Sequence, residues 1–566
     1  MVTTKRNKLI EGFIYYRVAF YMFAALLIYV VKDRLFRMSF YYLDLRLIRP
    51  LYDIYEYFFN YGLFALLGLV FIYTVMSRRY RLLTYGRSYF RDSKDFHKSY
   101  RELIRFYTKR SDIHRLDTSD CPYMRWTDAE GIVMGLDSNR RLLAIKSDCE
   151  SNLLTVGPPG SGKTFFHAIP NCMTFGGSVI CVDIKCACSS IVKAHSNRKI
   201  LTFCPDSEDA LRKSVRFDIF RDYHNMDSTD QKLFIENIAN IMIPFEGGES
   251  GSYFTSRARK IFRGVCHYYL DEEEPNADLP FIIHEILQSN IFKVGQAIEN
   301  SNCTVAKELV LSLKDGNEKN MGGAYDTLTT SLLPYSNDVL DVLLSNKDPK
   351  KCVTIKHLDA GYDLYLQIKQ EHINVYAPLL ALIIQEGLMR PLMQRPDAST
   401  GAELRPVLFI LDEFPRLSES MPYDTIDTLL STLRSKKVIV DILIQNIGQL
   451  EKIYGHEGAR AIMANCHYQI VLATNDPDSA NYFSELLGKK WVLKQSTSLS
   501  TTESKSSTSG ISVIEEQEAI YSPQDICDLP SENSMLVYFK GKHIKLKKLK
   551  TARFLRYEQR KQNRST

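Results

Sequence analysis

The stretch Gly157-Pro158-Pro159-Gly160-Ser161-Gly162-Lys163-Thr164 matches the phosphate-loop pattern GxxxxGK(S/T) at every fixed position. Residues 152–156 before it are typical of a buried strand, and residues 165–169 after it can begin a helix. In this context the glycines let backbone N–H groups close around a phosphate at the positive end of a helix. A plain turn is the alternative, but the Lys-Thr pair favours nucleotide binding. We therefore predict that all eight residues contact ATP, with Lys163 on the β- and γ-phosphates and the Thr164 hydroxyl on Mg²⁺.

A second motif indicates that the bound nucleotide is hydrolysed. The apolar run Pro406–Leu411 has the length of a strand and ends in the carboxylates Asp412 and Glu413. Asp412 at the tip of a strand can hold the Mg²⁺ shell, and Glu413 can polarise the attacking water. Such Asp-Glu pairs also occur as plain strand caps. Because a phosphate loop precedes this pair in the same chain, we predict an ATPase.

The composition indicates a multidomain α/β protein. With 566 residues the chain is long enough for about three domains, and a hydrophobic content of 45% supports sizeable cores. Its twelve cysteines include no CxxC pair, so we expect reduced thiols, with Cys186 and Cys188 as small core residues. Short apolar runs alternate with helical stretches, which predicts an α/β core of the RecA type with mainly parallel strands. These runs are Arg141–Lys146, Leu153–Val156, Ser178–Asp183, Ile200–Phe203, Leu364–Ile368, Val407–Leu411, Val438–Gln445 and Gln469–Ala473.

Two apolar stretches near the amino terminus, at residues 13–31 and 57–76, predict a membrane anchor. Each is long enough to cross a hydrocarbon core of about 30 Å. A cleaved signal peptide is the alternative for the first stretch and a buried core helix for the second, but no small-residue cleavage site follows the first. Basic residues flank the pair on its outer sides, so the positive-inside rule places both termini in the cytoplasm. We therefore predict a transmembrane hairpin over residues 1–80.

The rest of the chain divides into a core with an insertion and a tail. Residues 81–222 and 347–541 are assigned to the phosphate-loop ATPase domain. Residues 223–346 have apolar positions at helical spacing and are assigned to an all-α insertion domain. The Ser- and Thr-rich segment Ser496–Ser509 is expected to be a mobile loop or linker. Residues 542–566 form a basic carboxyl-terminal tail, which is either a solvated charge run or a contact for nucleic acid or anionic lipid.

These features together resemble the type IV coupling proteins of conjugation and type IV secretion (TraG/TraD-like). The similar motifs are Val179–Lys185, Leu408–Pro415, Thr432–Val438, Leu443–Leu450, Tyr454-Gly455, Thr474–Asp476 and Ser484–Gly488. One motif departs from the family pattern, since Asp183-Ile184-Lys185-Cys186-Ala187 stands where the family has Asp-Pro-Lys-Gly-Glu. The role of the missing carboxylate is therefore open, as is any docking role of the tail.

The resemblance implies an ATPase of the bacterial inner membrane that delivers substrate to a type IV secretion channel. The implied substrate is a relaxase with single-stranded DNA, or a protein effector, and the implied assembly is a homo-hexamer. Asp183 and Lys185 are then expected to help bind the nucleotide. Arg434 is expected to act in trans on a neighbour's γ-phosphate, and Gln445 to sense that phosphate or orient water. A surface arginine and a buried structural amide are the respective alternatives.

Two other functions are compatible with the same motifs. One is an FtsK-like pump for double-stranded DNA, which the helical insertion disfavours. The other is a non-catalytic membrane receptor whose nucleotide only holds a ring together, and its support is the altered Asp183–Ala187 motif. An ABC transporter subunit is disfavoured because the sequence has no LSGGQ-like signature.

Overall fold

The computed structural model describes residues 124–127, 129–137, 139–207, 209–245, 249–274, 276–289, 291–311, 318–418, 420–501, 507–549 and 555. The predicted spans at residues 13–31 and 57–76 lie outside these residues. Among the residues that are described, no helix is both long and apolar enough to cross a membrane. Described residues up to 494 and from 514 onward belong to one compact unit, and the segment Gln495–Val513 belongs to another.

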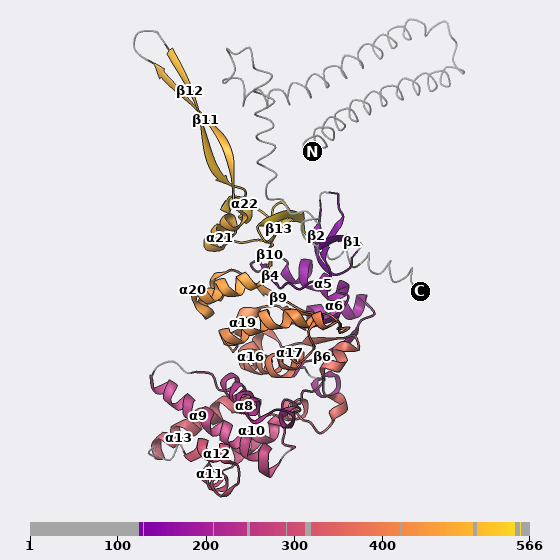
Figure 1. The fold of residues 1–566 in the computed structure, drawn as a ribbon, viewed down its shortest axis with the longest axis vertical. Helices are drawn as coiled ribbons and strands as arrows, with labels where there is room; N and C mark the ends of the chain where they lie inside the picture. Colours follow the sequence, from indigo (N-terminus) through magenta and orange to yellow (C-terminus); the bar gives the residue numbers. More distant parts are fainter. Residues whose placement is uncertain are drawn as a thin grey trace, which may run out of the picture. The chain divides into compact units, whose positions relative to one another are not determined.

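A twelve-stranded sheet forms the centre of the larger unit (Figure 1). Seven neighbouring strands are parallel, in the order β10 (Tyr468–Val471), β4 (Leu153–Val156), β9 (Val438–Ile444), β8 (Val407–Leu411), β5 (Ser178–Val182), β7 (Tyr362–Leu366) and β6 (Lys199–Phe203). Five strands continue the sheet beyond β10 with antiparallel pairing, in the order β13 (Ser534–Phe539), β14 (Lys542–Lys547), β2 (Ile132–Leu136), β3 (Leu142–Ile145) and β1 (Met124–Thr127).

The parallel strands are continuously apolar because both faces of the sheet are covered. In β8, Val407, Phe409 and Leu411 belong to one buried cluster, whereas Leu408 and Ile410 belong to a second cluster on the opposite face. Helices following the phosphate loop and β5 pack on the second face: η2 (Lys163–Ala168), α5 (Ile169–Thr174) and α6 (Ala187–His195). The first face is covered by α16 (Ile373–Leu382), η8 (Ile383–Met389), α17 (Arg390–Met393), α18 (Phe414–Ser418), α19 (Tyr423–Thr432), η10 (Leu433–Lys436), α20 (Gly448–Asn465), α21 (Pro477–Leu487) and α22 (Pro523–Cys527).

The predicted α/β fold is confirmed, and each of the eight predicted runs overlaps a strand. One of them, β3, pairs antiparallel rather than parallel. The antiparallel strands β1, β2, β13 and β14 were not predicted. β14 occupies residues 542–547, where the sequence indicated the start of the basic tail. Its buried His543, Ile544 and Leu546 lie between β13 and β2, so these lysine-rich residues belong to the sheet.

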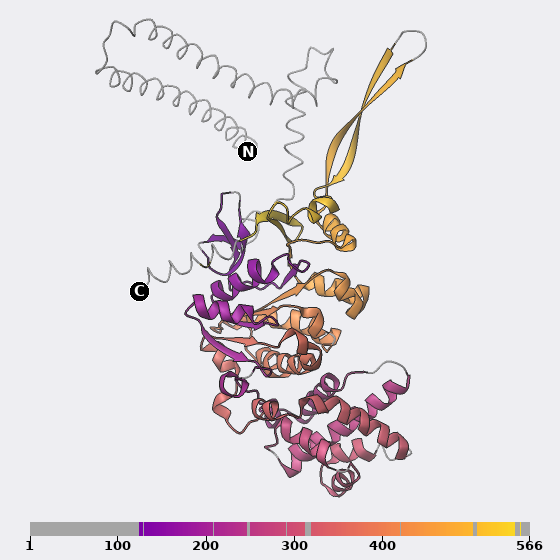
Figure 2. The ribbon, with the colours of Figure 1, turned by 180° about the vertical axis from the view of Figure 1, so that it is seen from behind.

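The described residues between β6 and β7 form helices, turns and one isolated bridge between Arg216 and Cys352. The bridge is closed by hydrogen bonds from Arg216 N to Lys351 O (3.1 Å) and from Val353 N to Arg216 O (2.8 Å). The chain therefore enters and leaves this helical region side by side, as an insertion requires. Its main helices (Figure 2) are α8 (Ser228–Met242), α9 (Glu249–Tyr268), α10 (Leu279–Gln288), α11 (Ile291–Asn300), α12 (Thr304–Leu311), α13 (Glu318–Leu332) and α14 (Asp338–Leu343).

The remaining short elements connect these parts of the fold. They are α7 (Ala210–Lys213), η3 (Tyr223–Asn225), η4 (Tyr269–Glu273), η5 (Leu333–Tyr335), η6 (Pro349–Lys351), α15 (Ile355–Asp359), η7 (Gln370–His372) and η9 (Ala398–Thr400).

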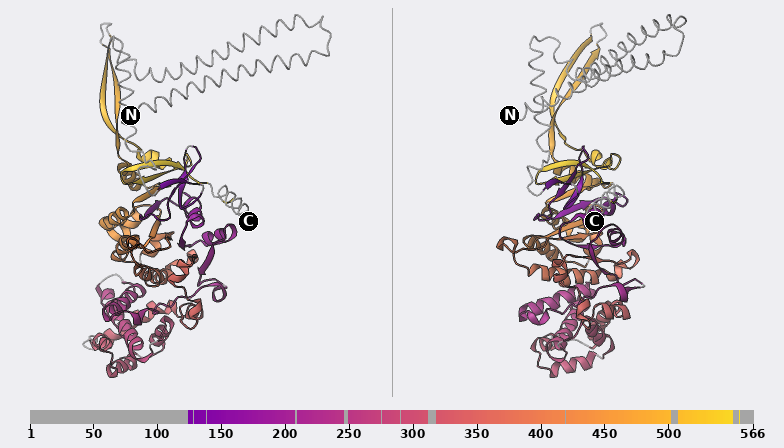
Figure 3. Two further views of the ribbon diagram at one scale, coloured as in Figure 1. Left: turned by 45° about the vertical axis from the view of Figure 1, so that its right-hand side comes forward. Right: turned by 90° about the vertical axis from the view of Figure 1, so that its right-hand side faces the viewer.

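The described residues of the Ser- and Thr-rich segment, 496–501 and 507–509, form strands rather than the predicted loop, and residues 502–506 lie outside the described residues. β11 (Lys489–Thr501) and β12 (Ser507–Ala519) pair with each other as a two-stranded sheet (Figure 3). The prediction was wrong because it required a core, whereas a strand pair can form through its backbone hydrogen bonds. Threonine is also β-branched and favours strands.

Candidate nucleotide-binding site

The phosphate loop begins where the buried strand β4 ends, at the carboxyl edge of the parallel sheet. Gly157 N donates to Ile444 O of β9 (3.1 Å), which fixes the start of the loop against the neighbouring strand. Gly160 and Gly162 have φ of 80° and 88°, a left-handed conformation that favours glycine. A Cβ at Gly162 would lie 2.2 Å from the Phe166 ring, so a side chain at this position would clash. The loop geometry thus depends on Gly162, a fixed position of the motif, and on Gly160 within it.

Lys163 and Thr164 begin η2 and are both buried. Lys163 Nζ donates to the Gly157 carbonyl across the loop. Burial lowers the pKa of Lys163, although the Glu413 and Asp412 carboxylates oppose this fall. Thr164 Oγ1 donates to Asp412 Oδ2 at 3.0 Å, so the first and second predicted motifs meet.

Asp412 and Glu413 follow β8, two strands away from the phosphate loop. Asp412 is buried, and burial raises the pKa of its carboxyl, while the hydrogen bond from Thr164 opposes the rise. Glu413 has φ of 56°, which is unusual for a residue with a side chain. Its Oε2 accepts a hydrogen bond from Gln445 Nε2 (3.0 Å), and its Oε1 lies 3.7 Å from Lys185 Nζ. Since β9 lies between β4 and β8, Gln445 at its end lies between the two motifs and contacts the second.

The altered motif after β5 contributes only one of its two predicted residues to this network. Lys185 lies next to Glu413, with about half of its side chain exposed. Asp183 is buried, and its oxygens instead accept hydrogen bonds from Ala187 N (3.0 Å) and Ser189 N (3.0 Å) at the start of α6. Asp183 therefore holds the amino end of α6 and does not join Lys163, Thr164, Asp412, Glu413 and Gln445.

Arg434 lies far from this site in its own chain. It is exposed in η10, directly before β9, whereas Gln445 directly follows β9. A strand of seven residues spans about 23 Å. Arg434 thus lies at the opposite edge of the sheet from the phosphate loop.

A fully buried polar network beneath the loop was not predicted. His167 Nε2 lies 2.7 Å from Asp441 Oδ2, and Thr155 Oγ1 donates to Asp441 Oδ1 at 3.0 Å. Asn171 Nδ2 lies 3.3 Å from His167 Nδ1, and Asn171 Oδ1 accepts from Val133 N at 2.6 Å. This network ties the helix after the loop to strands β4, β9 and β2. The sequence did contain a signal, since Asp441 is the single charged residue within the apolar run Val438–Ile444.

Lys548 is a second lysine in contact with the loop that was not predicted. It is buried, its Nζ donates to Ser161 O at 3.3 Å, and burial lowers its pKa. The Lys548 ammonium also lies 5.8 Å from the centre of the Phe166 ring. In the sequence this residue is one of many lysines near the carboxyl terminus, and nothing distinguishes it from its neighbours.

The residues at the loop fit a magnesium nucleotide. Ser161 Oγ is buried and has no hydrogen-bond partner among the described residues, so it is available to a ligand. Within the described part of the chain, no three His, Cys, Asp or Glu residues are grouped to hold a metal ion. Mg²⁺ bound with a nucleotide needs few protein ligands, because phosphates and water complete its shell. Thr164 and Asp412 supply suitable oxygen atoms.

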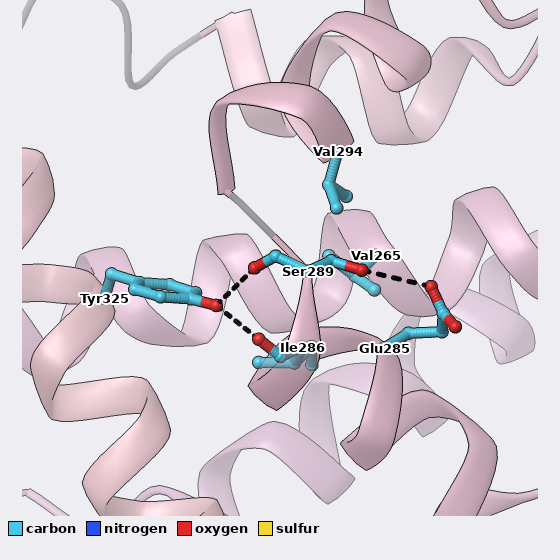
Figure 4. A pocket seen from close by; sticks show the side chains of 6 residues that line it. All are labelled: Val265, Glu285, Ile286, Ser289, Val294 and Tyr325. Carbon is cyan, nitrogen blue, oxygen red and sulfur yellow. Dashed lines mark hydrogen bonds between the residues drawn. The ribbon is translucent and has the colours of Figure 1, made fainter.

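A small pocket in the helical region offers no comparable site (Figure 4). Tyr325 OH donates to Ser289 O (2.9 Å) and to Ile286 O, and Ser289 Oγ donates to Glu285 Oε2 (3.3 Å). The polar groups of the pocket are thus bonded to one another, and its lining has no cation for a phosphate. The lining residues are Val265, Glu285, Ile286, Ser289, Val294 and Tyr325.

Comparisons with known proteins agree with this arrangement. The family model described as type IV secretory system conjugative DNA transfer matches residues 93–563. Protein VirD4 of Rhizobium radiobacter is 26% identical over 411 residues, covering 70% of this chain and 56% of the relative. The conjugal transfer protein TraG of Escherichia coli is 22% identical over 404 residues, covering 65% of this chain and 60% of the relative. The matched region thus spans little more than half the length of these relatives.

Solved structures of the plasmid coupling protein TrwB have a similar fold. The complex of TrwB with the non-hydrolysable ATP analogue ADPNP has a TM-score of 0.55 and 15% identity, covering 77% of this chain and 93% of TrwB. The complex with ADP and Mg²⁺ has a TM-score of 0.54 and 16% identity, covering 75% and 90% of the two chains. At this level of identity the likeness establishes the shared fold.

Proposed function

The chain belongs to the type IV secretory system conjugative DNA transfer family, and on this basis we propose that it is an ATPase that couples substrate to a type IV secretion channel. The observation that carries the proposal is the hydrogen bond from Thr164 to Asp412, 3.0 Å long, between motifs separated by 248 residues. Structures of TrwB with an ATP analogue and with ADP and Mg²⁺ support the same choice of ligand.

Each residue of the site has a proposed role in phosphoryl transfer. The backbone of residues 157–164 holds the phosphates of ATP, and Thr164 and Asp412 hold Mg²⁺, which neutralises phosphate charge when bound. Lys163 contributes positive charge to the β- and γ-phosphates. Glu413 accepts a proton from the attacking water, and the hydrogen bond from Gln445 orients its carboxylate. Lys185 places a positive charge beside the Glu413 carboxylate, with its Nζ 3.7 Å from Oε1.

The membrane anchor and the cargo remain parts of the proposal. The apolar stretches at residues 13–31 and 57–76 support an inner-membrane protein with both termini in the cytoplasm. We assign cargo recognition to the helical insertion. The expected cargo is a relaxase with single-stranded DNA or a protein effector. We expect a homo-hexamer, as the resemblance to the coupling proteins implies. In such a ring the exposed Arg434, which is too far from its own phosphate loop to act there, can act on that of a neighbour.

Two variants test the enzymatic part of the proposal. Lys163→Ala is expected to weaken ATP binding, and Glu413→Gln to retain ATP while phosphate release falls by about 10²-fold or more, as for other general bases. Glu403→Gln, at an exposed glutamate, and Lys193→Ala, at an exposed lysine of α6, are the matched controls. Phosphate release is measured with and without DNA, and cargo transfer in cells. Parental phosphate release by Glu413→Gln would exclude Glu413 as the base. Nucleotide binding without any hydrolysis by the parental chain would favour the nucleotide-gated receptor.

A further inference from the structure

Two cysteines meet at the same edge of the sheet as the nucleotide site. Cys186 follows β5 and Cys204 follows β6, on either side of β7. Asp183 N donates to Leu366 O (2.9 Å), and Gln367 N donates to Phe203 O (2.8 Å), so the three strand ends remain in register. The loops that carry the two cysteines therefore leave the sheet at the same level.

The two thiols interact with each other, and both are partly exposed. The thiol of Cys204 also lies 3.6 Å from Asp206 Oδ1, and its backbone N donates to Ser214 Oγ at 2.9 Å. Asp206 is itself held by the backbone N of Lys369 at 2.7 Å. Cys204 is thus fixed in place beside Cys186.

Cys186 occupies a backbone conformation that favours glycine. Its φ is 51°, at the position that begins α6, in the left-handed region where a residue with a side chain is strained. The conformation is held by the hydrogen bonds from Ala187 N and Ser189 N to Asp183. A cysteine here is therefore not explained by the local fold. Interaction with the Cys204 thiol lowers the pKa of the Cys186 thiol, which favours the nucleophilic thiolate.

Another group of thiols in the same domain provides an internal comparison. Cys172, Cys181 and Cys188 also contact one another, but all three are fully buried. Reagents in solution cannot reach this group in the folded protein. Within the described residues, neither group contains three ligands placed to hold a metal ion. The accessible pair is thus suited to thiol oxidation and the buried group is not.

We propose that Cys186 and Cys204 are a reversible oxidation site, at which a peroxide such as hydrogen peroxide converts the two thiols to a disulfide. The Cys186 thiolate attacks one peroxide oxygen, an S–O bond forms, the O–O bond breaks, and the departing hydroxide takes up a proton to become water. Cys204 then attacks the Cys186 sulfur, the S–S bond forms, and the S–O bond breaks with release of a second water. Two thiols are oxidised and one peroxide is reduced to two waters.

The disulfide would act on the nucleotide site through Lys185. An S–S bond of about 2.05 Å is much shorter than a thiol hydrogen bond, so oxidation draws the two loops together. Lys185 directly precedes Cys186, and its Nζ lies 3.7 Å from Glu413 Oε1. Displacement of Lys185 removes the cation beside the carboxylate. This consequence rests on the proposed role of Glu413 in ATP hydrolysis, whereas the oxidation site itself does not.

The experiment treats the purified full-length chain with hydrogen peroxide, blocks free thiols by alkylation and maps disulfides by mass spectrometry without reduction. We expect one cross-link, between Cys186 and Cys204, which dithiothreitol reverses. Cys204→Ser removes the resolving thiol and Cys186→Gly replaces the strained residue, so neither variant should form the cross-link. Cys527→Ser, which removes another partly exposed thiol, is the matched control and should form it as the parent does.

Absence of the cross-link in folded protein, or a cross-link that instead joins Cys172, Cys181 or Cys188, would overturn the proposal. Phosphate release from ATP is measured on the same samples and is expected to fall at least about tenfold on oxidation, in the range of effects on a general base. The Cys204→Ser variant should keep its activity under peroxide. If the reduced parent releases no phosphate, the proposed ATPase fails, but the disulfide map still decides the oxidation site.

Discussion

The buried pair of His167 and Asp441 allows a quantitative prediction for the substitution Asp441→Ala. Both side chains are fully buried, and the two Asp441 oxygens accept from Thr155 Oγ1 (3.0 Å) and lie at hydrogen-bond distance from His167 Nε2 (2.7 Å). The substitution leaves His167 Nε2 and Thr155 Oγ1 without these acceptors. Because the site is buried, water cannot replace these acceptors. The free energy of unfolding should therefore fall by the full cost of the lost hydrogen bonds.

The expected loss is about 3–5 kcal/mol, because the two buried polar groups left without an acceptor each cost up to about 3 kcal/mol. For a domain of this size we expect the thermal midpoint to fall by roughly 6–12 °C. Asp441→Asn keeps the volume and one acceptor oxygen, so its loss should be smaller. ATP affinity should fall as well, because the network joins the helix that begins with Lys163 to the strand that ends before Gln445.

The assay is thermal unfolding of the full-length chain, with ATP binding measured on the same samples. Asp148→Ala, at an exposed aspartate, is the control and should change the free energy of unfolding by less than about 0.5 kcal/mol. In the double variant His167→Ala/Asp441→Ala the loss should be smaller than the sum of the single losses, since each removes the other's partner. If Asp441→Ala unfolds at the control temperature, or if the double loss is fully additive, the network does not stabilise the loop.

Three further predictions concern single side chains. Burial raises the pKa of Glu386 to about 7 from an ordinary 4.5, so the stability that this group provides is present below pH 4.5 and lost as the pH rises through 7. Glu386→Gln should therefore raise the free energy of unfolding by up to about 3 kcal/mol at pH 8 and much less at pH 5, in denaturant titrations. Mixing inactive Arg434→Ala with inactive Lys163→Ala protein should restore part of the ATP hydrolysis. If assembled Arg434→Ala protein alone hydrolyses ATP normally, Arg434 has no role in hydrolysis and is a surface charge. Lys548→Met should weaken ATP binding in a titration while Lys547→Met, at an exposed neighbour, should not; equal affinities would show that the Lys548 contact with Ser161 does not affect the loop.

The sequence predicted those parts of the fold that have a local signature. Parallel strands covered on both faces are continuous apolar runs, so β4, β5, β8 and β9 were identified, and the motifs at their ends were assigned correctly to one family, whose model covers residues 93–563. Of the antiparallel strands at the other end of the sheet, β3 was identified, whereas β1, β2, β13 and the lysine-bearing β14 were missed. Their strand character depends on neighbours that are distant in the sequence.

The contacts within the site were less predictable than its residues. The motif after β5 suggested that Asp183 and Lys185 act together, but only Lys185 lies near Glu413. Asp183 instead satisfies backbone N–H groups at the start of α6, a demand that arises only once that helix is formed. The contact between Lys548 and the loop likewise depends on where β14 ends, which no local pattern in the sequence indicates.

The two edges of the parallel sheet have different chemistry, and this difference bears on the proposed assembly. The carboxyl edge carries the phosphate loop together with Asp412 and Glu413. At the opposite edge, Arg434 and Lys540 both act on His467, whose pKa is lowered by burial and by these two cations. The cations at this edge lie too far from the phosphate loop of their own chain to contact its nucleotide. In an assembly they can instead contact the phosphates bound by an adjacent copy. Contacts of this head-to-tail kind close into a ring when the rotation between copies permits it, so the separation of Arg434 from its own loop favours an assembly in which each site is completed by its neighbour.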